Sequence, residues 1–231
     1  MCADRNDHRN DPPGESRSDL RSDPRIDALL GNPAVWRAGK SGVANAAVIP
    51  TGFAALDRQL PGGGWPAQGL IEFLIDRPGM GELGALLPAL VALQQLSRES
   101  WLMLVSPPHE PYAPALAARG VDLKRLLVTR TPEILWTMEQ ALRSGVCRAV
   151  IAWVGDTPSL RMQWLRRLQL AATQSGSLGV LCRPRRHARE SSPAVLRLEL
   201  EPASTGLTVR VLKSRGGPLG SVGLGLEDAD D

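Results

Sequence analysis

Cysteine is scarce in this chain, and no apolar run is long enough for a membrane. The 231 residues include three cysteines, Cys2, Cys147 and Cys182, and no C-x-x-C pair. This odd, scattered set argues against a disulfide framework or a metal site, and the last two lie in or beside apolar strand candidates, so we expect buried free thiols. No stretch approaches the roughly 18 apolar residues that span a bilayer, and the polar start MCADRNDHRNDPP does not resemble a signal peptide. We therefore expect a cytoplasmic protein without membrane contact.

Aromatic residues are also few, with six Trp, two Phe and one Tyr. Stacking platforms for single-stranded nucleic acid are correspondingly rare. Trp36 and Trp65 lie in turn-rich sequence, NPAVWRAGK and PGGGWPAQG, where an exposed indole is a common interface anchor. These two are the predicted partner-binding residues. The other candidates fall on element faces that we expect to be buried, namely Trp101, Trp136, Trp153 and Trp164.

Both ends of the chain lack apolar residues. Residues 1–27 hold seven Asp and Glu with five Arg and are interrupted by proline, and the final EDADD adds four acids. Such segments cannot bury enough apolar surface to fold, so we expect disorder at the N-terminus. Without these ends, 22 Lys and Arg face 13 Asp and Glu, which makes the core basic. The predicted divisions are a disordered charged tail (1–27), a partner or linker segment (28–49), a core (50–215) and a flexible acidic tail (216–231).

Strand and helix patterns alternate along the core. Apolar runs predict strands at 70–74, 101–105, 126–129, 149–154 and 178–182, and helical periodicity predicts helices at 82–96, 113–119, 132–144 and 159–174. This alternation is typical of an α/β fold with a mostly parallel sheet that helices flank on both faces. The end of the core, AVLRLEL and then LTVRVLK, has the period-2 alternation of antiparallel strands.

A glycine turn after the first of these strands has the position of a nucleotide-binding loop without its chemistry. In a G-x-x-x-x-G-K-[ST] loop, backbone amides hold phosphate, Lys neutralises it and the hydroxyl binds Mg²⁺. Here Gly79 and Gly81 form the turn, Glu82 stands at the Lys position and Leu83 at the hydroxyl position. We interpret these residues as a vestigial P-loop. The alternative is a plain strand-to-helix turn, which glycine explains unaided.

The flanking sequence carries a family resemblance. TGFAALDRQLPGGGWPAQGLIEFL precedes the turn, and GVDLKRLLVTRTPEILWTMEQALRSGVCRAVIAWV lies downstream of it. Over residues 50–215 the chain resembles the RecA family, and within it the ImuA branch of translesion-synthesis proteins, whose nearest named relatives are SulA-type SOS proteins. The resemblance implies a RecA-like core. It also implies a DNA-damage-induced accessory that acts with ImuB, a polymerase-like partner, and with an error-prone replicative-type DNA polymerase.

The groups that would hydrolyse ATP in a RecA-type enzyme are missing. The family register puts Pro108 at the position of the activating Glu and Trp153 at the position of the Walker B acid. Because the Lys and the Mg²⁺ ligand are also absent, no group remains to stabilise phosphoryl transfer. We therefore expect no ATPase activity, no cofactor and no metal.

The segment 157–189 is strongly basic, with seven Arg and no Asp or Glu. Guanidinium groups suit phosphate, and RPRRHAR stands where the second DNA-binding loop begins in the RecA resemblance. The alternative is a solvated loop whose arginines pair with acids from elsewhere. Lys213 and Arg215 resemble basic residues that RecA-type filaments send across a subunit interface. The predicted DNA-binding residues are Arg183, Arg185, Arg186, Arg189, Lys213 and Arg215.

Three functions fit these patterns. The leading hypothesis is a non-catalytic scaffold of SOS translesion synthesis that brings an ImuB-type partner and its polymerase to damaged DNA. DNA and RecA are then further candidate partners, and the protein associates with the nucleoid when active. The alternative is a SulA-like inhibitor of the division protein FtsZ, and a third is a weak ATPase with unconventional ligands. The basic segment favours the first, because a division inhibitor gains nothing from phosphate contacts.

Overall fold

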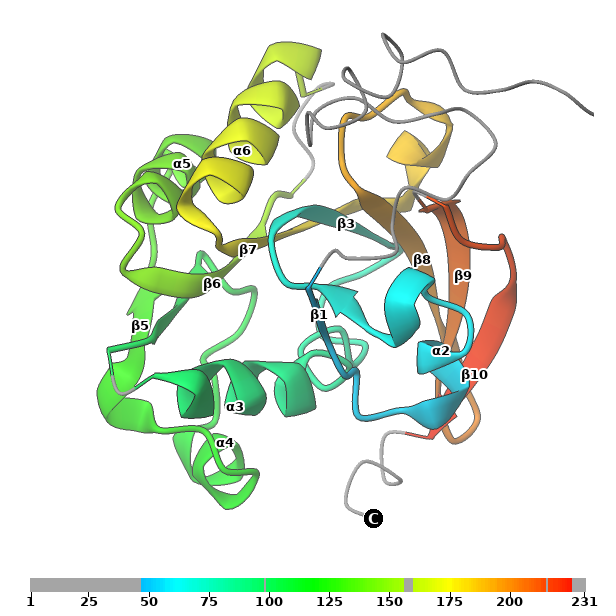
Figure 1. The fold of residues 1–231 in the computed structure, drawn as a ribbon, viewed down its shortest axis with the longest axis horizontal. Helices are drawn as coiled ribbons and strands as arrows, with labels where there is room; N and C mark the ends of the chain where they lie inside the picture. The colour runs from blue at the N-terminus through cyan, green and yellow to red at the C-terminus, as the bar shows by residue number, and fades with distance from the viewer. Residues whose placement is uncertain (1–46, 98, 156–159, 215, 226–231) are drawn as a thin grey trace, which may run out of the picture. The chain divides into compact units, whose positions relative to one another are not determined.

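The chain divides into two units, and the described residues all belong to the second, Val43–Asp231. The computed structural model describes residues 47–97, 99–155, 160–214 and 216–225. The predicted tail at 1–27, and all but the last three residues of the predicted segment 28–49, lie outside the described residues. In the described part, a mixed β-sheet carries helices on both faces (Figure 1).

The central sheet has eight strands. Six of them run parallel, and two C-terminal strands join antiparallel at one edge. The strands are β3 (Gly69–Ile75), β4 (Trp101–Val105), β5 (Leu126–Thr129), β6 (Cys147–Trp153), β7 (Leu178–Pro184), β8 (Leu196–Ala203), β9 (Gly206–Ser214) and β10 (Ser221–Gly225). Their order is β10-β9-β8-β3-β7-β6-β4-β5. The continuous apolar runs of β3, β6 and β7 form the middle of the sheet because these strands are buried on both faces.

The helices cover the two faces with separate hydrophobic clusters. On one face, α2 (Ala54–Asp57), α3 (Leu87–Leu96) and α4 (Ala113–Ala118) pack against alternate residues of β3 such as Ile71 and Phe73. On the other face, α5 (Ile134–Arg143) and α6 (Met162–Ser175) pack against Leu70, Val150 and Leu181. Figure 1 shows α5 and α6 side by side. Successive strand residues point to opposite faces, which is why two clusters form from one set of strands. A two-stranded ribbon pairs β1 (Val48–Ile49) with β2 (Trp65–Pro66).

Two predicted boundaries were wrong. Helix α3 begins at Leu87 rather than at Glu82, because 82–86 form turns and the side chain of Glu82 folds back onto the preceding loop. The predicted flexible tail from residue 216 contains β10, which pairs with β9 from Ser221 to Gly225 and so extends the sheet. The other predicted strands and helices lie within a few residues of the observed elements, apart from the start of the 159–174 helix, where residue 159 lies outside the described part.

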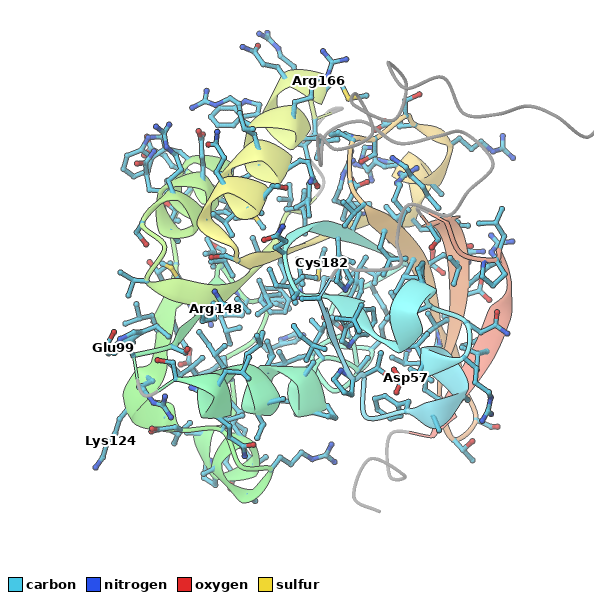
Figure 2. The ribbon with its side chains drawn as sticks, in the orientation of Figure 1. Asp57, Glu99, Lys124, Arg148, Arg166 and Cys182 are labelled. Atoms are coloured by element: carbon cyan, nitrogen blue, oxygen red, sulfur yellow. The ribbon has the colours of Figure 1, made fainter. Side chains whose placement is uncertain are left out.

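Both described cysteines are buried free thiols, as predicted. Cys182 lies in β7 in the interior (Figure 2) and Cys147 begins β6. Burial raises the pKa of the Cys182 thiol well above its ordinary value, with the nearby Glu82 carboxylate as a second cause. Burial also raises the pKa of Cys147. Both thiols are therefore held in the unreactive protonated form. Cys2 lies outside the described residues.

Candidate functional site

The loop after β3 wraps around the carboxylate of Glu82. The backbone amides of Gly79, Met80 and Gly81 donate hydrogen bonds of 2.8, 2.9 and 3.2 Å to it. The indole Nε1 of Trp153, at the end of β6, donates a fourth bond of 3.0 Å. Gly79 and Gly81 adopt φ angles of 81° and 114°, which glycine tolerates and which turn successive amides inward. Glu82 is only 2% exposed.

This arrangement gives the loop a structural role. The amides form an anion-binding nest, and the chain's own carboxylate occupies it. A phosphate would have to displace a buried group that already satisfies four donors, at a cost of several hydrogen bonds to a charged group. Leu83 packs against the first hydrophobic cluster. Gly79, Gly81, Glu82 and Leu83 lie in the glycine turn after the first predicted strand, and their interpretation as a vestigial P-loop has no support beyond the turn itself.

The first arginine of RPRRHAR is buried in the sheet. The side chain of Arg183 is 0% exposed and pairs with Glu72 of β3 at 2.6 Å and with Glu190 at 2.9 Å. Arg197 of β8 binds the second oxygen of Glu72 at 2.7 Å. Arg197 also donates to the carbonyls of His187, Ala188 and Glu190. These bonds fasten the 3₁₀ turn Arg185–Arg189 to the sheet.

The prediction that Arg183 contacts DNA was therefore wrong, because its guanidinium is enclosed and neutralised by carboxylates. Arg185 is also engaged, since it pairs with Asp76, Glu199 and Glu201, and these acids raise its pKa. Lys213 donates to the carbonyl of Ser192 at 2.6 Å. Arg186 and Arg189 are exposed, so DNA contact by these two stays an untested prediction, and Arg215 lies outside the described residues. Arg183 and Arg185 instead fit the alternative that we named from the sequence, in which the arginines pair with acids from elsewhere in the chain.

The structure does not place either of the two predicted partner-binding tryptophans, Trp36 and Trp65, on a surface. Trp65 is fully buried, with its ring centroid 5.8 Å from that of Phe73, because β2 places it against the first cluster. Trp36 lies outside the described residues. Among the described tryptophans, Trp136 on α5 is the most exposed, at 51%, although we predicted it to be buried.

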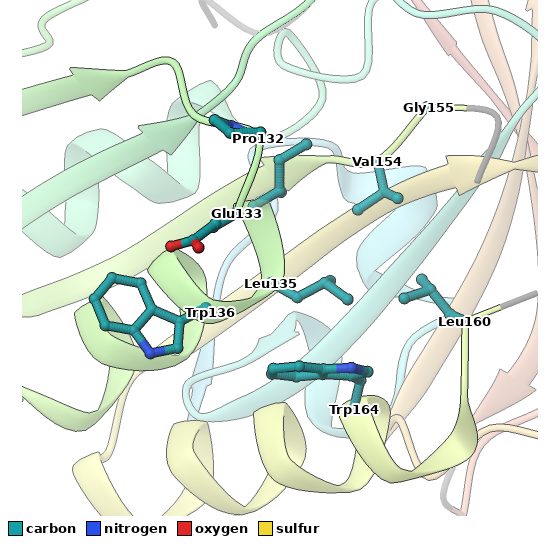
Figure 3. Close-up of a pocket in the computed structure, with 9 residues that line it drawn as sticks. Pro132, Glu133, Leu135, Trp136, Val154, Gly155, Leu160 and Trp164 are labelled. Carbon is teal, nitrogen blue, oxygen red and sulfur yellow. The ribbon is translucent and has the colours of Figure 1, made fainter. Parts of the chain in front are cut away.

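Trp136 borders a groove between the starts of α5 and α6. The groove encloses about 830 Å³ and lies beside Val154 and Gly155, which follow the carboxyl end of β6. In Figure 3, Leu135 and Leu160 point toward each other, with the ring of Trp164 beside them. The described lining is predominantly apolar and includes Pro132, Glu133, Ile134, Leu135, Trp136, Val154, Gly155, Leu160 and Trp164.

Polar contacts hold the walls of this groove in place. Ser106, with a φ of 50° directly after β4, exchanges hydrogen bonds with the backbone of Thr131 at 3.0 and 3.1 Å. This fixes the loop that leads into α5. On the other wall, the guanidinium of Arg167 lies 4.4 Å from the centroid of the Trp164 ring and pairs with Glu139 of α5 at 2.6 Å. Sequence reasoning missed the groove, although it placed a helix at 159–174, which carries the groove residue Trp164.

The described part of the chain was also searched for metal sites and membrane-spanning helices. Across residues 47–97, 99–155, 160–214 and 216–225, no group of three or more His, Cys, Asp or Glu side chains is placed to hold a metal ion. Within the same residues, no helix has the length and apolarity needed to cross a membrane.

Comparison with known proteins relates this chain to cell division inhibitors. The family model described as "Cell division inhibitor SulA" matches residues 69–179. A curated relative of that name from Edwardsiella piscicida is 36% identical over 106 residues, which are 44% of this chain and 60% of the relative. Another, from Photorhabdus laumondii subsp. laumondii, is 32% identical over 112 residues, which are 47% of this chain and 62% of the relative. The chain thus spans about three fifths of the curated relatives' length.

Among solved structures, the chain is similar to SulA from Pseudomonas aeruginosa. The TM-score is 0.40 at 24% sequence identity, and the match covers 49% of this chain and 97% of that one.

These matches correct the leading interpretation of the sequence. They relate the chain to SulA and give no support to the ImuA branch or to a RecA-like core. A role in translesion synthesis, with ImuB, a polymerase or RecA as partners, loses its basis, because it rested on that resemblance. The alternative named from sequence, a SulA-like inhibitor, is the one that the comparisons favour. The relatives' printed name describes inhibition of cell division.

Proposed function

We propose that this protein inhibits cell division by binding a component of the division machinery, with FtsZ as the partner. The observation that carries the proposal is the continuous match of residues 69–179 to the SulA model, together with relatives above 30% identity named as cell division inhibitors. The matched segment runs from the start of β3 to the start of β7. It therefore includes the Glu82 loop, both helices of the groove and the parallel strands that position them.

A binding mechanism suits the geometry better than catalysis does. The carboxylate of Glu82 fills the anion nest after β3, which argues against the third sequence hypothesis, a weak ATPase. Arg183 and Arg185 are committed to ion pairs inside the protein. An inhibitor that works by occupying its partner acts stoichiometrically, and one that binds FtsZ works in the cytoplasm, which is the compartment we propose.

Purified FtsZ provides the direct test. We expect the full chain to lower GTP-dependent FtsZ polymerisation, followed by light scattering, and to reach full inhibition near equimolar protein. We also expect bacterial cells that express the chain to grow into filaments without septa. Bovine serum albumin at equal concentration is the control in vitro, and a strain carrying empty vector is the control in cells. Unchanged polymerisation together with normal division would refute the proposal.

A further inference from the structure

We infer that a hollow lined by arginines beside β8 and β9 is a binding site for carboxylates, and that the acidic segment 226–231 of this same chain occupies it. The hollow encloses about 590 Å³ where β3 and β7 end. Its described lining includes Arg185, Arg186, Arg189 and Arg210 together with Asp76 and Glu199. The inference does not depend on the proposed function.

Positive charge exceeds negative charge in this hollow. Its lining holds four guanidinium groups and the two carboxylates of Asp76 and Glu199. Glu201, beside the hollow, also pairs with Arg185, and with this acid counted the arginines still outnumber the carboxylates. An excess of one sign of charge in a concave surface attracts groups of the opposite sign. The hollow is therefore suited to an anionic ligand.

Two of the arginines have donors left for such a ligand. Arg189 is exposed, and within the part of the chain that the structure describes its side chain has no hydrogen-bond or ion-pair partner. Arg210 is 51% exposed and directs Nε and Nη2 to a single oxygen of Glu199. The Nη1 group of Arg210 thus has no described partner. Guanidinium groups bind carboxylates through pairs of N–H donors in a fixed plane, so these two residues supply the contacts.

The floor of the hollow is held in place before a ligand arrives. Glu199 is buried, and one of its oxygens pairs with Arg185 while the other pairs with Arg210. Arg185 is held further by Asp76 at 3.1 Å. Because these ion pairs already order the arginine side chains, little conformational entropy is lost when a carboxylate binds.

The strand register brings the segment 226–231 within reach of the hollow. Strands β9 and β10 lie side by side (Figure 1), with Ser221 opposite Arg210 and Gly225 opposite Gly206. The distance along β9 from residue 206 to residue 210 is about 13 Å, at about 3.3 Å per residue. Six extended residues span about 20 Å, so a chain that continues from Gly225 can turn back and reach Arg210.

The segment also has the complementary charge. Residues 226–231, which lie outside the described residues, read LEDADD and include four acids and no Lys or Arg. Single exposed ion pairs are weak. A short tether, however, gives a ligand an effective concentration in the millimolar range, so weak pairs are enough to keep it bound. The other acidic stretch, 1–27, is joined to β1 through the longer segment 28–47, which lowers its effective concentration. A hollow occupied by 226–231 is closed to other anions.

Paramagnetic broadening in nuclear magnetic resonance measures the contact in the full chain. A nitroxide is attached at Asp231→Cys in a Cys2→Ser background, where the buried Cys147 and Cys182 should not react. We expect the amide signals of the hollow residues Ala188 and Leu212 to lose most of their intensity.

Three changes should restore these signals. Arg189→Glu removes an arginine that holds no other described group, and neutralisation of the segment by Glu227→Gln, Asp228→Asn and Asp230→Asn removes its charge. Salt at about 0.5 M screens exposed pairs. Arg119→Glu, at an exposed arginine after α4, is the matched control and should leave the broadening unchanged. Broadening that none of the three changes reduces overturns the proposal.

A peptide titration tests the site without the label. We expect the peptide LEDADD, added to a chain that ends at Gly225, to shift the side-chain Nε signal of Arg189 toward its position in the full chain. The neutral peptide LQNANN should not do so. The full chain should respond several-fold more weakly to LEDADD, because its own segment competes. Equal responses to the two peptides, or identical Arg189 signals in the full and shortened chains, contradict the proposal.

Other occupants give different results, and each of these overturns the proposal. If deletion of residues 1–27 moves the Arg189 signal and neutralisation of 226–231 does not, the N-terminal segment is the occupant. Broadening that persists in a mixture of nitroxide-labelled chains and separate isotope-enriched chains indicates a second copy. A labelled oligonucleotide that binds the full chain as tightly as the chain ending at Gly225 shows that the segment does not close the hollow.

Discussion

The indole Nε1 of Trp153 donates a 3.0 Å hydrogen bond to the carboxylate of Glu82, which lies 71 positions earlier in the chain. The bond joins the carboxyl ends of β3 and β6, two strands that flank β7 in the sheet. In the family register both residues stood where a nucleotide-binding site would carry a Lys and an acid. They do meet in space, but to close the loop instead of binding a ligand.

Loss of the Glu82 carboxylate should destabilise the fold markedly. Glu82→Ala leaves three amides and one indole N–H without their acceptor in a buried site, which we expect to cost about 2–4 kcal/mol in the free energy of unfolding. Trp153→Phe removes a single donor and should cost less on the hydrogen-bond side, about 1 kcal/mol. Urea denaturation followed by circular dichroism measures both. Equal stability of Glu82→Ala and wild type would show that water satisfies the loop.

The buried ion pair between Glu72 and Arg183 should be needed for stability. Glu72→Ala leaves Arg183 and Arg197 without their shared carboxylate, and removing one partner of a buried pair costs about 3–5 kcal/mol. Arg189→Ala, at an exposed position of the same turn, is the control and should change stability by only about 0.5 kcal/mol. Urea midpoints report the difference. Similar midpoints for Glu72→Ala and Arg189→Ala would mean that the two arginines find other partners.

Stability should depend on Glu190 in acid. Hydrogen bonds from His187 and from Arg183 lower the pKa of Glu190 below its ordinary value of 4.5. The ionised form is therefore favoured in the folded protein, and its stabilisation is complete above pH 4.5 and is lost as the pH falls through the lower folded pKa. The side chain is 37% exposed, so solvent reduces the effect. The Tm difference between wild type and Glu190→Gln should shrink below this pH, and a constant difference from neutral to acid pH would contradict the assignment.

The buried thiols should resist modification in the folded state. In a Cys2→Ser variant, Cys147 and Cys182 are the remaining cysteines, and burial raises the pKa of both. We expect Ellman's reagent to react slowly with the native protein, because only an exposed thiolate attacks the reagent. After denaturation in guanidinium, two thiols per chain should react. Rapid reaction of the native variant, at the rate of the denatured one, would show that these strands open readily.

Strand and helix positions followed from local pattern, because an apolar run or a helical stripe is a property of neighbouring residues. For that reason the sequence predicted the apolar runs of β3, β6 and β7 and the period-2 pattern of β8 and β9. It did not predict the exposure of single tryptophans. Trp65 lies in a glycine-rich turn, yet its ring packs beside that of Phe73. Trp136 lies on a helix face that we expected to be buried, yet its side chain reaches the surface.

The sequence by itself determined an alternating α/β chain, buried thiols and an unusual turn at Gly79–Glu82. Tertiary structure decided what the charged residues do. RPRRHAR looks like a free basic loop because its acidic partners are far away in the sequence, and Glu72 lies 111 positions from Arg183. Sheet order places β3 beside β7 and β8, and that pairing turns isolated charges into a buried network. Ion pairing and burial depend on neighbours in space, which local sequence patterns do not specify.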